Sequence, residues 1–203
     1  MVELPHEPHS AIICGQRGCG KTQFVLDELL HPDKGIYRDA FENVFVLCPT
    51  WRRNKTYLER SWLWRNKCIY FIDPRDRLHD WLRVLFDLCA DSPTLYLLDD
   101  LAASGTLKKK KDMLSELAFS GRHAKQYVWV LTQKYNAVSK DLREQTKWTA
   151  LFHCKDRDSF DDCLRENDVV PADERAAVRA KLAAQKHAKL LLKTDQPAAY
   201  IVL

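Results

Sequence analysis

Short apolar runs of strand length recur along the 203-residue chain, and segments of helical length lie between most of them. Several runs are continuously apolar instead of alternating with polar residues, which is typical of strands buried on both faces of a parallel sheet. The predicted strands are 10–14, 43–48, 68–72, 94–98, 127–132, 148–154, 189–193 and 199–203. The predicted helices are 22–30, 56–64, 78–90, 109–120, 140–146, 157–167 and 171–187.

The alternation of strands and helices predicts an α/β fold with a largely parallel central sheet flanked by helices. The last two strands flank the turn sequence Thr194-Asp195-Gln196-Pro197, so we expect a C-terminal β-hairpin. We find no internal repeat and no linker composition. The expected organisation is therefore a single domain over residues 1–203, with a core of about 10–155 and C-terminal helices and hairpin in 156–203.

The composition excludes several classes of protein. With 46% hydrophobic and 30% charged residues, the chain is typical of a globular protein and not of a disordered tail. No apolar run approaches the roughly 18 to 20 residues of a membrane span, and the acidic start lacks the pattern of a signal peptide. The seven cysteines form no Cys-x-x-Cys pair and no zinc pattern, which favours reduced thiols inside a cell.

Residues 15–22 match the phosphate-binding pattern G-x-x-x-x-G-K-[ST], with an apolar strand before them and a helix after them. In such loops the glycines let backbone N–H groups curl around phosphates. We expect Lys21 to reach the β- and γ-phosphates and the Thr22 hydroxyl to bind Mg²⁺. A chance match is the alternative, and the flanking strand and helix argue against it. The expected nucleotide-binding residues are Gly15, Gln16, Arg17, Gly18, Cys19, Gly20, Lys21, Thr22 and Gln23.

Two acids follow the apolar strand 94–98, at the kind of sheet edge where open α/β proteins bind ligands. Asp99 is the expected Mg²⁺ partner, acting through water, because Mg²⁺ retains several waters beside phosphates. Asp100 is then placed to orient or deprotonate the attacking water. The alternative is a strand-ending acid that caps the next turn.

Three further residues complete the expected catalytic set with Lys21 and Asp100. Gln133 ends the strand 127–132, where its amide could orient water near the γ-phosphate. An arginine from a neighbouring subunit can neutralise charge in the transition state, and Arg122 is the first candidate for that role and Arg143 the second. An ordinary surface arginine is the alternative for either one.

Positive charge is concentrated in one part of a chain with a net charge of +4, which hints at a polyanionic partner. Residues 108–111 are four consecutive lysines that could follow DNA phosphates from a loop, or form the solvated start of a helix. Residues 51–67 mix basic and aromatic side chains, as nucleic-acid-binding segments do. For this second segment we favour an amphipathic helix packed on the core.

In their order along the chain, these motifs resemble the FtsK–HerA superfamily of hexameric DNA-pumping ATPases. Within it, the chain is most similar to the genome-packaging ATPases of poxviruses, their large-DNA-virus relatives and virophages. The resemblance covers roughly residues 10–155. It rests on the phosphate loop, Leu97-Leu98-Asp99-Asp100, Gly121-Arg122, Val130-Leu131-Thr132-Gln133, Leu142-Arg143, and the strand end Leu47-Cys48-Pro49-Thr50 followed by Tyr57 and Trp62.

The resemblance implies an ATP-hydrolysing DNA translocase that packages viral double-stranded DNA into a capsid, with ATP and Mg²⁺ as cofactors. It implies an additional strand between the Walker A strand, which leads into the phosphate loop, and the Walker B strand, which ends at Asp99. Gln133 would be the γ-phosphate sensor at the tip of that strand. A homo-oligomeric ring, hexamer or pentamer, would supply the trans-acting arginine and surround the DNA.

The same resemblance implies a capsid or portal partner and a location inside the infected host cell, in cytoplasm or nucleus, or in the virion. The chain departs from the pattern at Asp100, where many members have Glu, and by the lack of a further domain before the loop. The second departure favours a compact viral motor. Alternative hypotheses are a P-loop nucleotide switch or kinase, a cellular or plasmid DNA-pumping ATPase, and a non-catalytic nucleic-acid-binding or scaffold protein.

Overall fold

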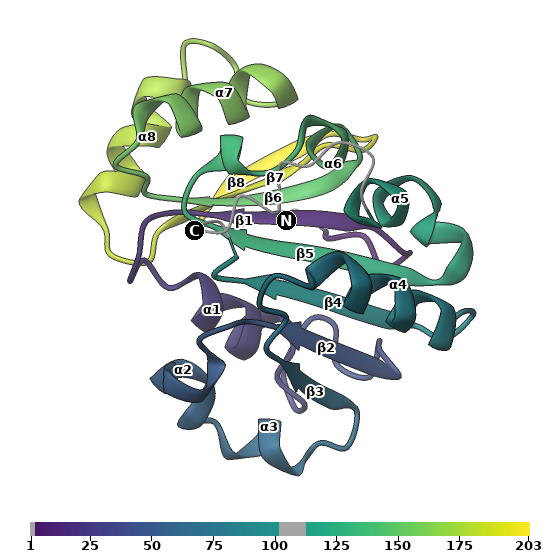
Figure 1. Cartoon of the computed structure of the whole chain (residues 1–203). Coiled ribbons are helices and arrows are strands. Elements are labelled where there is room, and N and C mark those ends of the chain that lie inside the picture. Colours follow the sequence, from purple (N-terminus) through teal and green to yellow (C-terminus); the bar gives the residue numbers. More distant parts are fainter. Residues whose placement is uncertain (1–2, 102–112) are drawn as a thin grey trace.

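An eight-stranded sheet forms the centre of the computed structural model, which describes residues 3–101 and 113–203 (Figure 1). Across the sheet the strand order is β3-β2-β4-β5-β1-β6-β7-β8. All pairs among β1 to β6 are parallel, and β7 is antiparallel to both β6 and β8. The strands are β1 (Ser10–Cys14), β2 (Asn43–Leu47), β3 (Ile69–Ile72), β4 (Thr94–Asp99), β5 (Gln126–Thr132), β6 (Thr146–Phe152), β7 (Lys189–Lys193) and β8 (Ala199–Val202).

This topology confirms the predicted fold class. The sheet is largely parallel, β7 and β8 form the C-terminal hairpin, and β5 lies between β1, which leads into the phosphate loop, and β4, which ends at Asp99. Parallel strands end at a common edge, so the residues that follow β1, β2, β4 and β5 are brought together there.

Helices cover both faces of the sheet, as Figure 1 shows. One face packs against α4 to α8, and the other against α1, α2, α3 and the π-helical turn Val25–Leu29 that continues α1. The helices are α1 (Lys21–Phe24), α2 (Lys55–Leu58), α3 (Ser61–Arg65), α4 (Leu78–Leu88), α5 (Met113–Ser120), α6 (Lys140–Glu144), α7 (Arg157–Asn167) and α8 (Arg175–Ala184). Within the described ranges, none of these helices is long and apolar enough to cross a membrane.

The strand β1 explains why the central runs are continuously apolar. Its side chains alternate between the two cores: Ile12 and Cys14 belong to one, and Ala11 and Ile13 to the other. All four are fully buried because both faces of the sheet are covered. A strand that is buried on both faces has no position for a polar side chain facing solvent.

The predicted helix 56–64 is wrong, because the structure has two short helices, α2 and α3, separated by Glu59 and Arg60. Arg60 adopts an extended backbone conformation, and its guanidinium binds the Asp27 carboxylate through Nε–Oδ1 at 2.7 Å and a terminal nitrogen to Oδ2 at 2.6 Å. This bidentate ion pair ties the interruption between α2 and α3 to the π-helical turn that contains Asp27. A contact so distant in sequence is invisible to helical periodicity.

Two smaller boundary predictions are also wrong. The helix expected at 171–187 begins only at Arg175, since residues 172–174 form a turn, and it ends at Ala184. The strand expected at 148–154 is β6 at Thr146–Phe152, which begins directly after α6.

Candidate active site

The phosphate loop connects β1 to α1, and its glycines are required by its shape. Gly18 and Gly20 have φ of +77° and +102°, in the left-handed region that side chains rarely adopt. A Cβ at Gly15 would lie 2.6 Å from Cβ of Phe152, so the loop packs directly on the end of β6. The loop therefore keeps its backbone close to the sheet edge, as phosphate binding by backbone N–H groups requires.

Lys21 places a positive charge at this loop. Its Nζ donates hydrogen bonds to the carbonyl oxygens of Gly15, at 2.7 Å, and Gln16, at 3.0 Å. The side chain thus folds back along the loop, and its ammonium group lies within a few ångströms of the backbone that would surround a phosphate chain.

Asp99 at the end of β4 meets the phosphate loop directly. The Thr22 hydroxyl donates to Asp99 Oδ2 at 3.1 Å, and the Tyr57 hydroxyl donates to the same oxygen at 2.7 Å. Asp99 is only 6% exposed, and burial raises the pKa of its carboxyl, while the bonds from Tyr57 and Thr22 act in the opposite direction. A buried carboxylate of this kind is stabilised by a cation.

The geometry of Thr22 and Asp99 fits magnesium. The Thr22 hydroxyl oxygen could bind Mg²⁺ while its proton stays directed at Asp99 Oδ2, and Asp99 would then hold the ion through this hydrogen bond and through water, as expected from the sequence. A hydroxyl, a carboxylate and neighbouring phosphate oxygens are also the hard donors that Mg²⁺ prefers.

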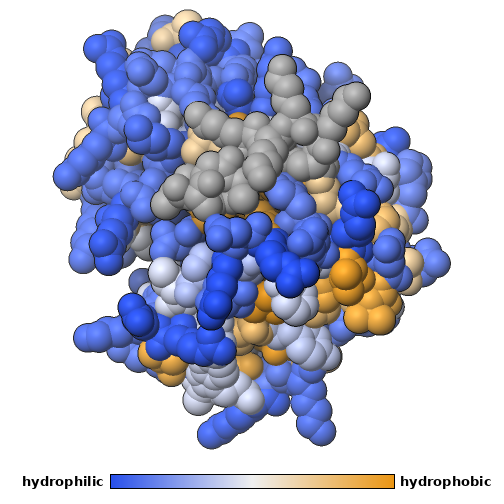
Figure 2. All heavy atoms as spheres, viewed as in Figure 1, coloured by the Kyte–Doolittle hydropathy of each residue, from blue (hydrophilic) through white to orange (hydrophobic). Residues whose placement is uncertain are grey.

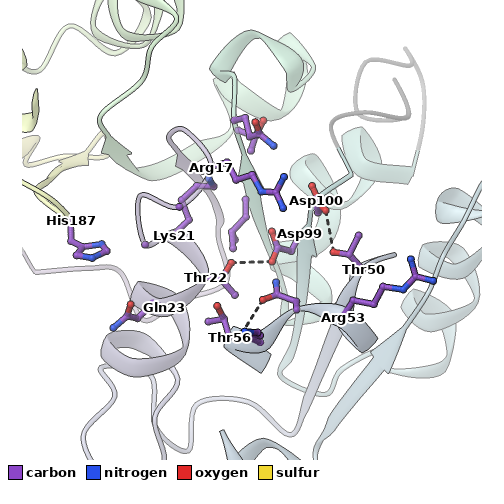
Figure 3. Close-up of a pocket in the computed structure, with 17 residues that line it drawn as sticks. Arg17, Lys21, Thr22, Gln23, Thr50, Arg53, Thr56, Asp99, Asp100 and His187 are labelled. Carbon is purple, nitrogen blue, oxygen red and sulfur yellow. Dashed lines mark hydrogen bonds between the residues drawn. The ribbon is translucent and has the colours of Figure 1, made fainter. Parts of the chain in front are cut away.

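Asp100 turns into the same space from the neighbouring position. Its φ is +57°, a left-handed conformation that aspartate tolerates better than most residues. The Thr50 hydroxyl, just beyond the end of β2, donates to Asp100 Oδ2 at 3.0 Å. In Figure 3 both aspartates face the region between Arg17, Thr22 and Thr50. The contact orients the Asp100 carboxylate, which a general base or a water-positioning residue needs.

These residues surround a cavity of about 750 Å³, a volume typical of small-molecule sites. Figure 3 shows His187 and Gln23 at one end of it, Thr50 and Arg53 at the other, and Lys21, Thr22 and Asp99 between them. The lining residues are Arg17, Gly18, Gly20, Lys21, Thr22, Gln23, Thr50, Arg53, Asn54, Lys55, Thr56, Asp99, Asp100, Leu131, Thr132, Gln133 and His187.

The structure brings together most of the predicted site residues. Lys21, Thr22, Asp99, Asp100 and Gln133 all line this cavity, although they come from three separate strand ends. Of the predicted loop residues, Arg17, Gly18, Gly20 and Gln23 also line it, whereas Gly15, Gln16 and Cys19 form the loop without lining the cavity.

The two candidate arginines do not line this cavity. Arg122 is exposed, and its Nε donates to His123 at 3.3 Å. Arg143 is held against the Tyr135 ring and forms an ion pair with Glu166, beside a second cavity of about 470 Å³. Both were expected to act on a neighbouring subunit, so their roles stay predictions. The lysine run 108–111 lies outside the described residues.

Sequence reasoning missed several residues of the site. The sequence marks Thr50 and Tyr57 only through the family resemblance, and Arg53, Asn54, Lys55 and Thr56 fall in the segment 51–67, for which it favours a helix packed on the core. Thr50 could have been found, because it follows a parallel strand and so must lie at the ligand-binding edge. His187 lies just before β7, where no motif marks it.

No protein-family model matches the sequence, and no curated protein matches it. Solved structures with the same fold include the DNA-packaging ATPase B204 of Sulfolobus turreted icosahedral virus, at 12% identity over 98% of this chain and 97% of that one, with a TM-score of 0.69. The genome-packaging NTPase B204 of Sulfolobus turreted icosahedral virus 2, in complex with ATP-γ-S, has 11% identity over 96% of both chains and a TM-score of 0.68.

The ATPase 2 and 3 region of EssC from Geobacillus thermodenitrificans also shares the fold, at 12% identity and a TM-score of 0.60. The alignment covers 98% of this chain and 40% of that one. These structures show that this chain has a P-loop NTPase fold, and that the likeness to the viral packaging NTPases spans nearly the full length of both chains.

Proposed function

We propose that this chain hydrolyses ATP and uses the energy to move viral double-stranded DNA into a capsid. The observation that carries the proposal is the 3.1 Å contact between Thr22 of the phosphate loop and Asp99 at the end of β4. The likeness to B204, which is named a genome-packaging NTPase and was solved with ATP-γ-S, supports ATP as the nucleotide and DNA packaging as the function.

The chemistry follows from the positions of the side chains. Backbone N–H groups of the loop and the Lys21 ammonium would hold the β- and γ-phosphates, and Thr22 and Asp99 would hold Mg²⁺. Bound Mg²⁺ would neutralise negative charge on the phosphate oxygens. Asp100 and Gln133 would orient the water whose oxygen attacks the γ-phosphorus while the bond to the ADP oxygen breaks.

Thr50 has a role in this proposal that the sequence did not indicate. Its hydroxyl holds Asp100 Oδ2, so Oδ1 of the same carboxylate is available to accept a hydrogen bond from the attacking water. The proton leaves with the products, ADP and inorganic phosphate, by way of Asp100 or a phosphate oxygen.

The motor would be a homo-oligomeric ring, pentamer or hexamer, with DNA in its centre and Arg122 or Arg143 reaching the next subunit. It would act inside the infected cell, or in the virion, with a capsid or portal protein as partner. The net charge of +4 and the lysine run at 108–111 favour contact with the phosphate backbone rather than with base edges.

The test is ATP hydrolysis by the assembled protein with and without double-stranded DNA. We expect DNA to stimulate turnover, and Lys21→Ala to lower kcat by about 10²–10³-fold, the loss typical of one removed charge-stabilising donor. Lys34→Ala, an exposed lysine away from the cavity, is the matched control. Hydrolysis that DNA does not stimulate in a ring would contradict a translocase and favour a nucleotide switch or kinase.

A further inference from the structure

His187 closes one end of the nucleotide cavity, although it comes from the C-terminal segment that carries no motif. Its Nδ1 lies 2.9 Å from the carbonyl oxygen of Cys19 in the phosphate loop. A Cβ on Gly20 would approach the same nitrogen to 2.5 Å, so the imidazole lies directly against the loop. Figure 3 shows the ring beside Lys21 and Gln23, on the side away from Asp100 and Thr50.

The orientation of a bound nucleotide follows from the residues that would hold its phosphates, and this step rests on the proposed function. In that proposal Lys21, Thr22 and Asp99 hold the β- and γ-phosphates, and Asp100 and Gln133, which line the same cavity, orient the attacking water. The sugar and base must then extend in the opposite direction. In this cavity that direction leads to Gln23 and His187.

We propose that His187 is a nucleobase-binding residue, with its imidazole ring stacked on the base of the bound nucleotide. The side chain is exposed at the cavity, and no other aromatic ring of residues 3–101 and 113–203 stacks on it. Its hydrogen bond to Cys19 uses the ring edge and leaves the face of the ring for stacking. Bases of every kind offer a π-face, so aromatic stacking gives affinity without selecting adenine over guanine.

The ring is held in place before any nucleotide binds. His187 has φ of +69°, an uncommon conformation for histidine, at the turn that leads into β7. Two residues later, Lys189 Nζ binds Glu28 at 3.0 Å and lies 5.0 Å from the centre of the Phe24 ring. The segment is thus fastened to the helix that follows the phosphate loop, which lowers the entropy lost when the base stacks.

The test compares binding of ATP and of inorganic tripolyphosphate, each with Mg²⁺, by titration calorimetry. Tripolyphosphate has the same phosphate chain and no base. We expect His187→Ala to raise the Kd for ATP about tenfold, within the range of aromatic–base stacking, and to leave the Kd for tripolyphosphate unchanged. His187→Phe keeps an aromatic face and should bind ATP like the original protein. Lys186→Ala, an exposed neighbour outside the cavity, is the control.

Two outcomes would overturn the assignment. Equal weakening of ATP and tripolyphosphate by both variants would mean that His187 only supports the loop through Cys19. Unchanged affinities in His187→Ala would remove it from the site. Neither outcome concerns DNA: tripolyphosphate and ATP binding by the unmodified chain test the nucleotide site, and DNA-stimulated turnover tests the motor separately.

Discussion

Asp99 and His9 are both buried ionisable groups, and they lie at opposite ends of the parallel strands of one sheet. Asp99 ends β4, whereas His9 immediately precedes β1. The imidazole Nε2 of His9 accepts hydrogen bonds from the indoles of Trp129, at 3.0 Å, and Trp148, at 2.8 Å, and its Nδ1–H donates to the Glu7 carbonyl at 2.8 Å. The proton on Nδ1 is assigned from these partners, because a carbonyl can only accept.

The two groups differ in whether any of their polar atoms remains available to a ligand. Both nitrogens of His9 have partners within the protein, and burial lowers its pKa to about 4, so the ring is neutral and offers no free nitrogen to a ligand. Asp99 receives its two hydrogen bonds on Oδ2 and borders a cavity that contains Lys21. A buried group whose polar atoms are all paired within the protein serves stability, and a buried group that keeps an atom open to a cavity is available for a ligand.

The largest expected effect comes from removing the Asp99 charge. Asp99→Asn should lower Mg²⁺-dependent turnover by about 10³-fold, since a bound metal ion stabilises the charge of the transition state by several kcal/mol. Without nucleotide, the same variant should unfold at a higher temperature, because burial raises the pKa of Asp99 and so disfavours its charged form in the folded state. Turnover assays and thermal unfolding measure the two effects. A variant with full turnover would contradict the metal assignment.

Removing the His9 ring should lower the stability of the fold and leave nucleotide binding unchanged. His9→Ala leaves two buried indole N–H groups without an acceptor, so we expect a loss of about 3 kcal/mol in the free energy of unfolding. Chemical denaturation measures this, with the exposed His123→Ala as control. The Kd for ATP should be unchanged, and a large change would show that the two regions are coupled.

The low pKa of His9 predicts a pH dependence of stability. The unfolded chain binds a proton on this ring below about pH 6.5, while the folded chain does so only below about pH 4. Stability is therefore fully present above pH 6.5 and falls as the pH decreases, by about 2 kcal/mol at pH 5. The comparison with His9→Gln isolates this contribution, because all the carboxylates are common to both proteins. Parallel pH curves would refute it.

The smallest effect is expected at Tyr57, which acts through Asp99. Tyr57→Phe removes the 2.7 Å hydrogen bond that orients the carboxylate, so the affinity for Mg²⁺ in the presence of nucleotide should fall about tenfold. Turnover at saturating Mg²⁺ should change much less. Tyr70→Phe, on the exposed side of β3, is the matched control and should leave the Mg²⁺ dependence as it was.

Much of this site could be predicted from the sequence because its main residues belong to short, contiguous motifs. The loop at 15–22 and the acids at 99 and 100 each follow an apolar strand, and parallel strands end at one edge. The same argument predicts the position of Gln133, which lines the cavity. Arg60 shows the limit: its pairing with Asp27 breaks a predicted helix, and no local pattern encodes that contact.

The sequence by itself determined the α/β fold, the phosphate loop and the two acids, since periodicity and short motifs are properties of neighbouring residues. Only the tertiary structure decided that Thr50 holds Asp100, that Tyr57 holds Asp99 and that His187 covers the loop. These partners come from separate elements, and their contacts depend on strand order and on how the C-terminal segment packs. Such contacts are fixed by the three-dimensional arrangement of the sheet and by no spacing along the chain.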